Sequence, residues 1–461
     1  MSKPLFSTLP FSEKLIKNLD SLGYQSMTPV QSASLPAILD EKDLIVQAKT
    51  GSGKTAAFGL GLLQKINPKF FGLQSLVLCP TRELADQVAK EIRQLARCIP
   101  NIKLVVLCGG KPLGPQADSL EHGAHIAVGT PGRIKDHLSR STLDLSGVET
   151  LVLDEADRML DMGFYDEIIN IVQQTPSNRQ TLLFSATYPN AIKKMCRSIQ
   201  REPVVIKVDE KHEDDVIEQK FYLTNNYQRK ETLLHLLSHF ELTSTVIFCH
   251  TKIQCDEIAR FLQDNQVEAL ALHGDLEQRE RDQVLVLFSN NTCPVLVATD
   301  VAARGLDIKS LQGVINYELP HDPEIYTHRI GRTGRAGEQG LALSLYTDAE
   351  ISRIISLEDY LEKPCNNESV ESLEPKANFS LHSELATLQI DAGKKSKIRP
   401  GDLLGALTKD AGLAGAQIGK INIFEQFSYV AIERKVLAQA LSYFRKGKVK
   451  GRNVKAREIR R

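Results

Sequence analysis

The stretch AKTGSGKT at residues 48–55 constrains the fold of this chain more than any other part of its 461 residues. A short apolar run precedes it and a segment with helical periodicity follows it, so its glycines lie on a turn between a buried strand and a helix. Such turns occur in α/β domains, in which helices connect and cover the strands of a parallel sheet. The stretch therefore predicts an α/β fold.

The same turn has the chemistry of a phosphate-binding loop. Gly51 and Gly53 let successive backbone N–H groups face an anion, and Lys54 supplies a charge beside the outer phosphates. The hydroxyl of Thr55 is a suitable ligand for Mg²⁺. The strict pattern has glycine where this chain has Ala48, which leaves an ordinary glycine turn as the alternative. We expect a nucleotide to contact Ala48, Thr50, Gly51, Ser52, Gly53, Lys54 and Thr55.

A second acidic strand end, LVLDEAD at residues 151–157, supplies what a nucleotide site needs for hydrolysis. Asp154 ends an apolar run, which places its carboxylate at the carboxyl edge of a parallel sheet, where α/β proteins bind ligands. We expect Asp154 to hold Mg²⁺ through water. Glu155 is the candidate that orients and deprotonates the attacking water, because phosphoryl transfer depends on positioning and charge stabilisation. The alternative is the capped start of a helix.

Together with the triplet Ser185-Ala186-Thr187, these motifs resemble those of the DEAD-box RNA helicases, whose phosphate loop commonly begins with alanine. The resemblance extends from about Phe6 to about Tyr346. It implies two RecA-like parallel-sheet domains in tandem, ATP and Mg²⁺ as cofactors, and RNA-stimulated ATP hydrolysis. It also implies that Ser185 and Thr187 link the nucleotide site to the RNA side, where they could contact Asp157. Without the resemblance, the triplet is a strand end capped by hydroxyls.

The segment before the phosphate loop has candidates for reading the base of the nucleotide. An amide such as Gln31 can both donate to and accept from the edge of adenine, and an aromatic ring such as Tyr24 can stack on it. A glutamine on a surface is usually only solvated. The family resemblance assigns this glutamine motif, with Phe6, to the selection of ATP.

Apolar runs alternate with amphipathic stretches between residues 73 and 154, as in a parallel sheet covered by helices. Residues that directly follow these strands fall on the ligand-binding edge of the sheet. Arginines there can meet phosphates, while hydroxyls and glycine amides contact the RNA backbone without reading bases. In the family, the corresponding motifs grip single-stranded RNA. The candidates are Pro80, Thr81, Arg82, Gly110, Thr130 and Arg133.

A charged run at residues 207–216 is interpreted as a linker to a second α/β domain, which has no phosphate loop. Arg332 and Arg335 lie three residues apart, near one helical turn, and so could point toward one site. A guanidinium that reaches the γ-phosphate acts as an arginine finger, although arginines at this spacing often only form surface ion pairs. The family motif assigns both arginines to ATP. It also places Gly305 and Asp307 on the nucleotide, and Thr299, Gln278 and Arg281 on RNA.

The last part of the chain is basic, although the net charge of the whole is zero. Residues 381–461 contain 17 Lys and Arg against 7 Asp and Glu, which predicts contact with a polyanion. The order of apolar and amphipathic segments in residues 384–461 is βαββαβ, which suggests an RNA-recognition-motif-like domain. Its base-stacking signature is poor, so Phe427 and Tyr429 are either stacking residues or part of the packing of the sheet. We interpret residues 363–380 as a second linker.

The sequences GKKSKIRPGDLLGALT and GAQIGKINIF resemble the C-terminal domain of a group of bacterial DEAD-box helicases. This resemblance implies tethering to a hairpin of large-subunit ribosomal RNA next to a duplex, within a pre-ribosomal particle, and a role in assembly of the large subunit. The candidates for RNA contact are basic, namely Lys394, Lys395, Lys397, Arg399, Lys448, Lys450 and Arg452.

These observations predict three domains, at residues 1–206, 217–363 and 384–461, in a monomeric cytoplasmic protein. No apolar run approaches the ~20 residues of a membrane span, and MSKPLFSTLPF at the start lacks the apolar core of a signal peptide. Eight cysteines occur without a C-x-x-C pair, and Cys79 and Cys249 are expected to be buried thiols. Two alternatives to a helicase that locally unwinds short duplexes remain: an ATP-gated RNA clamp or annealing chaperone, and a DNA helicase.

Overall fold

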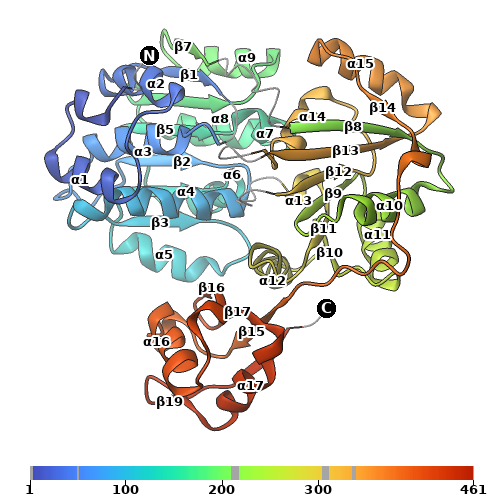
Figure 1. Cartoon of the computed structure of the whole chain (residues 1–461). Helices are drawn as coiled ribbons and strands as arrows, with labels where there is room; N and C mark the ends of the chain where they lie inside the picture. Colours follow the sequence, from blue (N-terminus) through green and yellow to red (C-terminus); the bar gives the residue numbers. More distant parts are fainter. Residues whose placement is uncertain (1–3, 49–50, 209–216, 304–310, 335–338, 460–461) are drawn as a thin grey trace. The chain divides into compact units, whose positions relative to one another are not determined.

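The computed structural model describes residues 4–48, 51–208, 217–303, 311–334 and 339–459 (Figure 1). The described chain has three parts: a first lobe (residues 4–208), a second lobe (residues 217–381) and a C-terminal domain (residues 384–459). By its internal contacts the chain forms two compact units, and the second unit contains both the second lobe and the C-terminal domain. Among the described residues, no helix is long and apolar enough to cross a membrane.

The first lobe is built on a seven-stranded parallel sheet in the order β3-β4-β2-β5-β6-β1-β7. Most of its strands are buried in every residue, as expected for a sheet that helices cover on both faces. The strands are β1 (Leu44–Gln47), β2 (Ser75–Leu78), β3 (Leu104–Leu107), β4 (Ile126–Gly129), β5 (Thr150–Asp154), β6 (Gln180–Ser185) and β7 (Val204–Lys207).

Two apolar cores lie on the two faces of this sheet. Helices α1 to α4 contribute to one core and α6 to α9 to the other, while Leu120 of α5 packs against the second core (Figure 1). The helices are α1 (Glu13–Ser21), α2 (Pro29–Leu39), α3 (Lys54–Lys65), α4 (Arg82–Leu95), α5 (Leu113–Glu121), α6 (Pro131–Ser139), α7 (Ala156–Asp161), α8 (Tyr165–Gln173) and α9 (Asn190–Ile199).

The second lobe repeats this architecture with a parallel sheet in the order β10-β11-β9-β12-β13-β8-β14. The two sheets confirm the prediction of two successive α/β domains. The strands are β8 (Ile217–Leu223), β9 (Thr245–Cys249), β10 (Ala269–Leu272), β11 (Val295–Thr299), β12 (Gly313–Asn316), β13 (Gly340–Tyr346) and β14 (Asn367–Glu368). The helices are α10 (Arg229–Phe240), α11 (Lys252–Asp264), α12 (Gln278–Ser289), α13 (Asp300–Ala303), α14 (Pro323–Ile330) and α15 (Ile351–Leu361).

Residues 363–380, which we interpret from the sequence as a second linker, are folded onto the second lobe. Strand β14 within this segment pairs with β8, and the backbone N–H of Lys376 donates to Ser238 Oγ. Leu373 and Leu381 are buried in the apolar core that α10 and α11 also line. The segment is therefore a strap packed on the second lobe. At the other proposed linker, Lys207 is the last residue of β7, and residues 209–216 lie outside the described part of the chain.

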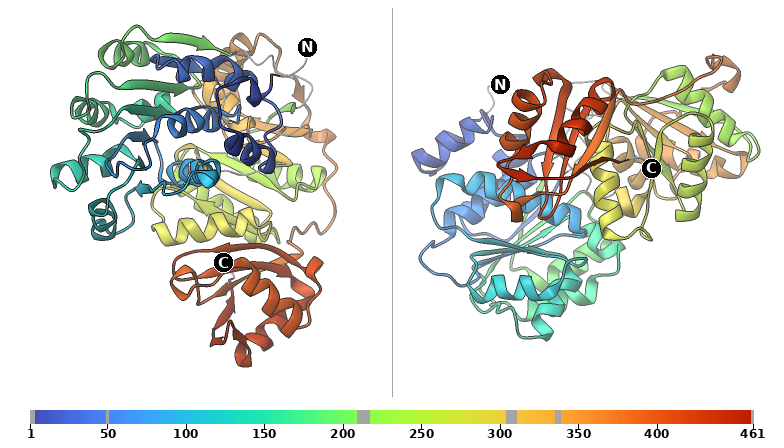
Figure 2. Two further views of the ribbon diagram at one scale, coloured as in Figure 1. Left: turned by 90° about the vertical axis from the view of Figure 1, so that its left-hand side faces the viewer. Right: turned by 90° about the horizontal axis from the view of Figure 1, so that it is seen from below.

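The C-terminal domain has a four-stranded sheet in the order β16-β17-β15-β20, with two helices on one side (Figures 1 and 2). The pairs are antiparallel, as the βαββαβ prediction requires. A short β18–β19 hairpin at residues 448–453 was not predicted. The elements are β15 (Leu385–Ile390), α16 (Pro400–Gly405), β16 (Ile418–Ile423), β17 (Ser428–Glu433), α17 (Leu437–Lys446), β18 (Lys448–Val449), β19 (Arg452–Asn453) and β20 (Ala456–Glu458).

Candidate functional site

The phosphate loop runs from β1 to α3, as the sequence predicts. Gly51 and Gly53 both have φ of +90°, a conformation that favours glycine, and Gly53 is the N-cap of α3. A Cβ atom on Gly53 would lie 2.5 Å from Gln31 Nε2, so any side chain there would displace the Gln31 amide. Lys54 is buried, and its Nζ donates to the carbonyl oxygen of Ala48 at 3.0 Å. Ser52 is buried and Thr55 half-buried, whereas Thr50 lies outside the described residues.

The glutamine motif is joined to this loop by direct hydrogen bonds. Gln31 Nε2 donates to the carbonyl oxygen of Gly53 at 3.2 Å, and Gln31 Oε1 accepts from the N–H of Thr28 at 2.8 Å. Phe6 packs edge-on against Tyr24, with ring centroids 6.2 Å apart. Burial and the nearby Glu91 raise the pKa of Tyr24 to about 12, so this hydroxyl stays protonated at neutral pH. Base selection by Phe6, Tyr24 and Gln31 stays a prediction.

Asp154 ends β5 with a carboxylate that suits a cation. The residue is 3% exposed, and its Oδ1 is buried without a hydrogen-bond partner. Burial raises the pKa of Asp154 to about 7, although Lys54 acts in the opposite direction. An ionised carboxylate in a dry site needs a positive partner, and Mg²⁺ prefers oxygen ligands of this kind. The residues present therefore fit a magnesium site at Asp154.

Glu155, the next residue, has an unusual backbone. It is in the left-handed region with φ 53° and ψ 52°, which costs free energy for any residue except glycine. This conformation ends the strand and begins α7, and the Glu155 side chain is buried. Its Oε2 lies 3.0 Å from Nη1 of Arg158, which is also buried.

Asp157 holds the triplet at the end of β6. Its Oδ2 accepts hydrogen bonds from the N–H groups of Ala186 (3.2 Å) and Thr187 (2.9 Å) and from the hydroxyl of Thr187 (3.0 Å). In return, Ser185 Oγ accepts from the N–H of Asp157 at 3.2 Å. The expected contact between the triplet and Asp157 is present. The acidic strand end and the triplet are thus one hydrogen-bonded unit.

The ends of β2, β3 and β4 bring the proposed RNA-binding residues of the first lobe together. A Cβ atom on Gly109 would lie 3.1 Å from the guanidinium of Arg82, and Arg133 Nη1 donates to the carbonyl oxygen of Lys111 at 3.0 Å. Thr81 Oγ1 accepts from the N–H of Leu84 and so caps α4. Pro80 is buried at the end of β2, Gly110 has φ of +76°, and Thr130 is the N-cap of α6.

In the second lobe, Arg329 of the YTHRIGRTGR motif is held by neighbours in its own lobe. Arg329 is 2% exposed, and it is held by Asp300 in a bidentate ion pair at 2.7 and 2.8 Å. It also donates to Asn316 Oδ1 and lies over the ring of Phe248. Arg329 therefore has a structural role that our sequence analysis missed. Arg332 is buried, Thr299 ends β11 and Arg281 lies on α12, whereas Gly305, Asp307 and Arg335 fall outside the described residues.

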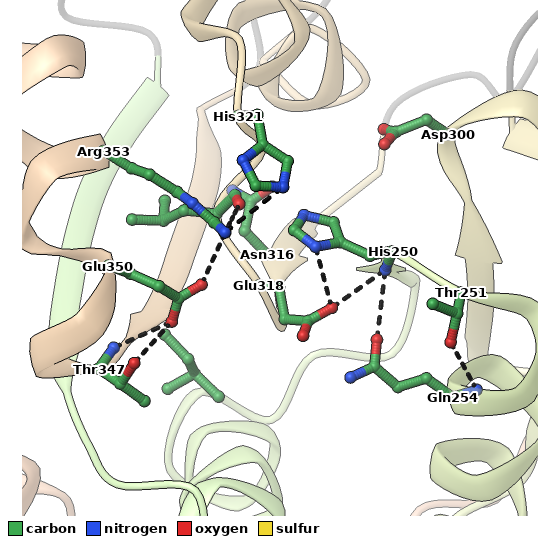
Figure 3. Close-up of polar contacts among 12 residues, drawn as sticks. His250, Thr251, Gln254, Asp300, Asn316, Glu318, His321, Thr347, Glu350 and Arg353 are labelled. Atoms are coloured by element: carbon green, nitrogen blue, oxygen red, sulfur yellow. Dashed lines mark hydrogen bonds and ion pairs between the residues drawn. The ribbon is translucent and has the colours of Figure 1, made fainter.

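A polar network around His250, which follows β9, was also missed (Figure 3). The ring of His250 stacks on that of His321, with centroids 5.3 Å apart, and its Nδ1 lies 3.4 Å from Glu318 Oε2. Arg353 donates to the carbonyl oxygen of Leu319 and to Glu350. Burial lowers the pKa of His250, and the nearby arginines add to this shift while Glu318 opposes it. In the sequence these residues are isolated polar positions after separate strands, and no motif joins them into a recognisable cluster.

The predicted basic residues of the C-terminal domain occupy two segments that meet. Lys450 Nζ donates to the carbonyl oxygen of Lys397 at 3.0 Å, although 53 positions separate the two residues. The basic residues of both segments are exposed, and the second segment forms the β18–β19 hairpin. We call this surface the basic strip; it comprises Lys394, Lys395, Lys397, Arg399, Lys448, Lys450 and Arg452.

Comparison with known proteins agrees with this geometry. Residues 28–195 match the DEAD/DEAH box helicase family, and residues 228–337 match the helicase conserved C-terminal domain. The chain is 53% identical to the ATP-dependent RNA helicase DbpA of Escherichia coli over 96% of its own length and 97% of that protein. The chain belongs to the DEAD-box family of RNA helicases. It is also 43% identical to the ATP-dependent RNA helicase CshA of Listeria monocytogenes, over 78% of this chain and 69% of that protein.

Solved structures of related helicases have the same fold as this chain. This DEAD-box helicase is similar to Saccharomyces cerevisiae Dbp5 bound to RNA and ADP-beryllium fluoride, with a TM-score of 0.72 and 31% identity over 80% of this chain and 96% of the other. Its two parallel-sheet lobes are RecA-like domains in tandem. Residues 387–458 match the DbpA RNA binding domain. The helicase is therefore an RNA-stimulated ATPase with an additional RNA-binding domain.

Proposed function

We propose that this helicase unwinds short RNA duplexes locally while its C-terminal domain holds a hairpin of large-subunit ribosomal RNA. It acts as a monomer on a pre-ribosomal particle in the cytoplasm, in assembly of the large subunit. The observation that carries this proposal is the basic strip, because two segments distant in sequence join into one exposed cationic surface. Clustered lysine and arginine side chains bind the phosphates of nucleic acids. The similarity to DbpA over nearly the whole chain supports the ribosomal target.

The hydrolytic site is proposed to use the residues of the first lobe in distinct roles. Lys54 and the N–H groups at Gly51 and Gly53 bind the phosphates, and Glu155 orients the attacking water and takes its proton. Asp154 and Thr55 hold Mg²⁺, which neutralises charge on the phosphates when it is bound. Arg332 and Arg335 of the second lobe complete the site as arginine fingers when the lobes close, with Gly305 and Asp307 against the nucleotide.

RNA is proposed to couple to this site through the hydrogen-bonded triplet. Arg82, Arg133 and the hydroxyls of Thr81 and Thr130 contact the backbone of one strand, and Thr299 and Arg281 contact it from the second lobe. Ser185 and Thr187, held by Asp157, connect these contacts to Asp154 and Glu155. Closure around ATP bends the bound strand out of duplex geometry, and hydrolysis releases it.

The test is ATP hydrolysis stimulated by three RNAs: a large-subunit ribosomal RNA fragment that contains a hairpin next to a duplex, the same duplex without the hairpin, and total RNA. We expect the fragment with the hairpin to stimulate at the lowest concentration. Reversing Lys395 and Lys397 to glutamate should weaken hairpin binding by about tenfold or more, since each lost phosphate contact also becomes a repulsion. Basal hydrolysis should not change.

The matched control is Lys435→Glu, which reverses an exposed charge of the same domain. Lys435 lies just after the last residue of β17. The basic strip lies near the other end of this strand, where Ser428 donates a hydrogen bond to the carbonyl oxygen of Ala392. Equal loss of hairpin binding in the control would contradict a local RNA site. In a strand-displacement assay, release of the duplex strands in step with hydrolysis supports unwinding. Annealing, or RNA retained after hydrolysis, indicates the clamp or chaperone instead.

A further inference from the structure

The sheet of the C-terminal domain is covered on both of its faces. One face carries the core of the domain, which includes Leu388 of β15 and Val430 of β17. Because successive side chains of a strand point to opposite faces, the alternate residues of these strands point away from that core. They are Thr387, Gln389, Tyr429 and Ala431, and their exposed fractions are 1%, 2%, 5% and 0%. Another part of the chain therefore covers this second face.

The covering part is α12 of the second lobe together with the loop that follows it. The guanidinium of Arg279 on α12 lies 5.1 Å from the centroid of the Phe427 ring, which precedes β17. Beyond the end of the helix, the hydroxyl oxygens of Thr292 and Thr387 are 2.8 Å apart and buried. The first contact lies beside the start of β17 and the second within β15, so the covering reaches both central strands of the sheet. The Phe427 ring, one of the two candidates for base stacking, is already engaged by an arginine of the same chain.

An ionic cluster lies at the rim of this contact. Arg434, just after β17, donates to Glu268 at 2.6 Å and to the carbonyl oxygen of Ser383 at 2.7 Å. Glu268 precedes β10 of the second lobe, and its other oxygen accepts from the N–H of Ser383 at 2.9 Å. His382 adds a third group within 3.6 Å of Glu268. The short connection between strap and domain is thereby fixed at both sides.

We propose that the second face of the C-terminal sheet is a docking surface for α12 and not a base-stacking surface. The docked contact fixes the basic strip relative to the helix that carries Gln278 and Arg281. An RNA held by the strip then has a defined position relative to the second lobe, so the duplex beside the hairpin is presented to the same helix each time. The docking itself follows from the contacts above, whereas its use in positioning RNA rests on the proposed function.

A disulfide lock in the full chain tests the docking. In the Thr292→Cys/Thr387→Cys variant, the two thiols take the places of two hydroxyl groups whose oxygens are in contact. The oxidant diamide should therefore convert the two thiols to a disulfide with little backbone movement. The single variants control for pairing with the native cysteines, of which Cys293 is the neighbour of Thr292. Peptide mapping by mass spectrometry identifies the bond. We expect the cross-link in the double variant only.

RNA binding by the locked protein then separates docking from base stacking. If the basic strip binds the hairpin, the oxidised variant should retain hairpin affinity within about threefold of its reduced form, a difference of about 0.6 kcal/mol or less. A loss of tenfold or more in the oxidised form would show that RNA uses the covered face, and failure to form the cross-link would overturn the docking. If the unmodified protein does not bind the hairpin, the proposed function fails, but the cross-link still reports on docking.

A further substitution in the cysteine pair tests the aromatic contact. Phe427→Ala in the cysteine pair removes the ring beside Arg279, and we expect cross-linking to slow by at least threefold because the docked state is less populated. The control is Tyr227→Ala, which removes an aromatic ring that is 96% exposed on the second lobe. Equal rates in the two variants would show that the Arg279–Phe427 contact does not hold the domain.

Discussion

The carboxylate of Asp157 organises the end of β6, and its replacement by asparagine gives the sharpest prediction. Asparagine keeps the shape of the side chain but removes the charge. Oδ2 of Asp157 accepts three hydrogen bonds from Ala186 and Thr187, and Oδ1 accepts one from the N–H of Arg158 at 2.9 Å. An amide has only one oxygen, so its NH₂ group must face one of these donors. The substitution therefore weakens the hydrogen bonds to the remaining oxygen and places an N–H group against the donors that contacted the other oxygen.

The size of the effect follows from the count of contacts. Hydrogen bonds to a charged group contribute about 1.5–3 kcal/mol each, against about 0.5–1.5 kcal/mol for neutral partners, and a buried donor without an acceptor costs about 1–3 kcal/mol. These contributions are not additive within one network. We expect Asp157→Asn to lower the local stability of residues 185–187 by about 2 kcal/mol, which corresponds to about 30-fold faster hydrogen exchange.

The assay is hydrogen–deuterium exchange of the full-length protein, with RNA-stimulated ATP hydrolysis measured in parallel. The matched control is Asp166→Asn, which removes an exposed carboxylate from the first turn of α8 in the same lobe. Exchange at residues 185–187 within threefold of the parent protein would refute the argument that the carboxylate holds this segment. Loss of RNA stimulation with unchanged exchange would instead assign Asp157 a direct role in RNA coupling.

Three further predictions concern the loop, the buried arginine and the titration of a histidine. Gly53→Ala should weaken nucleotide binding, measured with a fluorescent ATP analogue, because alanine is strained at a φ of +90° and its Cβ would displace Gln31 Nε2, which lies 2.5 Å away. Gly114→Ala, with open space around its Cβ, should bind normally. Arg329→Lys should destabilise α14 by about 2–4 kcal/mol, measured by hydrogen exchange, because lysine cannot reproduce the two parallel hydrogen bonds of the guanidinium to Asp300. The surface substitution Lys230→Arg should have no effect. Burial lowers the pKa of His250, so the unfolded chain binds the proton more tightly than the folded one. The second lobe should therefore lose stability as the pH falls below about 6.5. His250→Gln should flatten this dependence of stability on pH, and an unchanged slope in the variant would contradict the prediction.

Much of the fold was predictable because its strands are buried and its motifs lie at strand ends. The apolar runs before Asp154, Cys249 and Thr299 all form strands of the two parallel sheets. Strand β8, by contrast, has polar and apolar residues in a mixed pattern, and it was not predicted. The strap at residues 363–380 was misread because only a few of its residues, such as Leu373, reach the core and most of the others are exposed.

The chemistry of the site was less predictable where it depends on which side chains meet. Sequence motifs indicated Lys54 and Asp154 through their positions next to buried strands. They could not show that Gln31 is bonded to the phosphate loop, or that Arg329 is committed to Asp300 within its own lobe. The burial of Asp43, which accepts from the N–H groups of Thr181 and Arg201, likewise arises from a fold-level contact across 138 and 158 positions.

The strap sets the smallest piece of the chain in which the second lobe can be complete. Leu373 and Leu381 fill the layer between the sheet and helices α10 and α11, and β14 shields the outer edge of β8. A fragment that stopped after the last long helix, at Leu361, would expose apolar surface and an unprotected strand edge at once. Isolated second lobes prepared for spectroscopy or crystallisation should therefore end beyond residue 381.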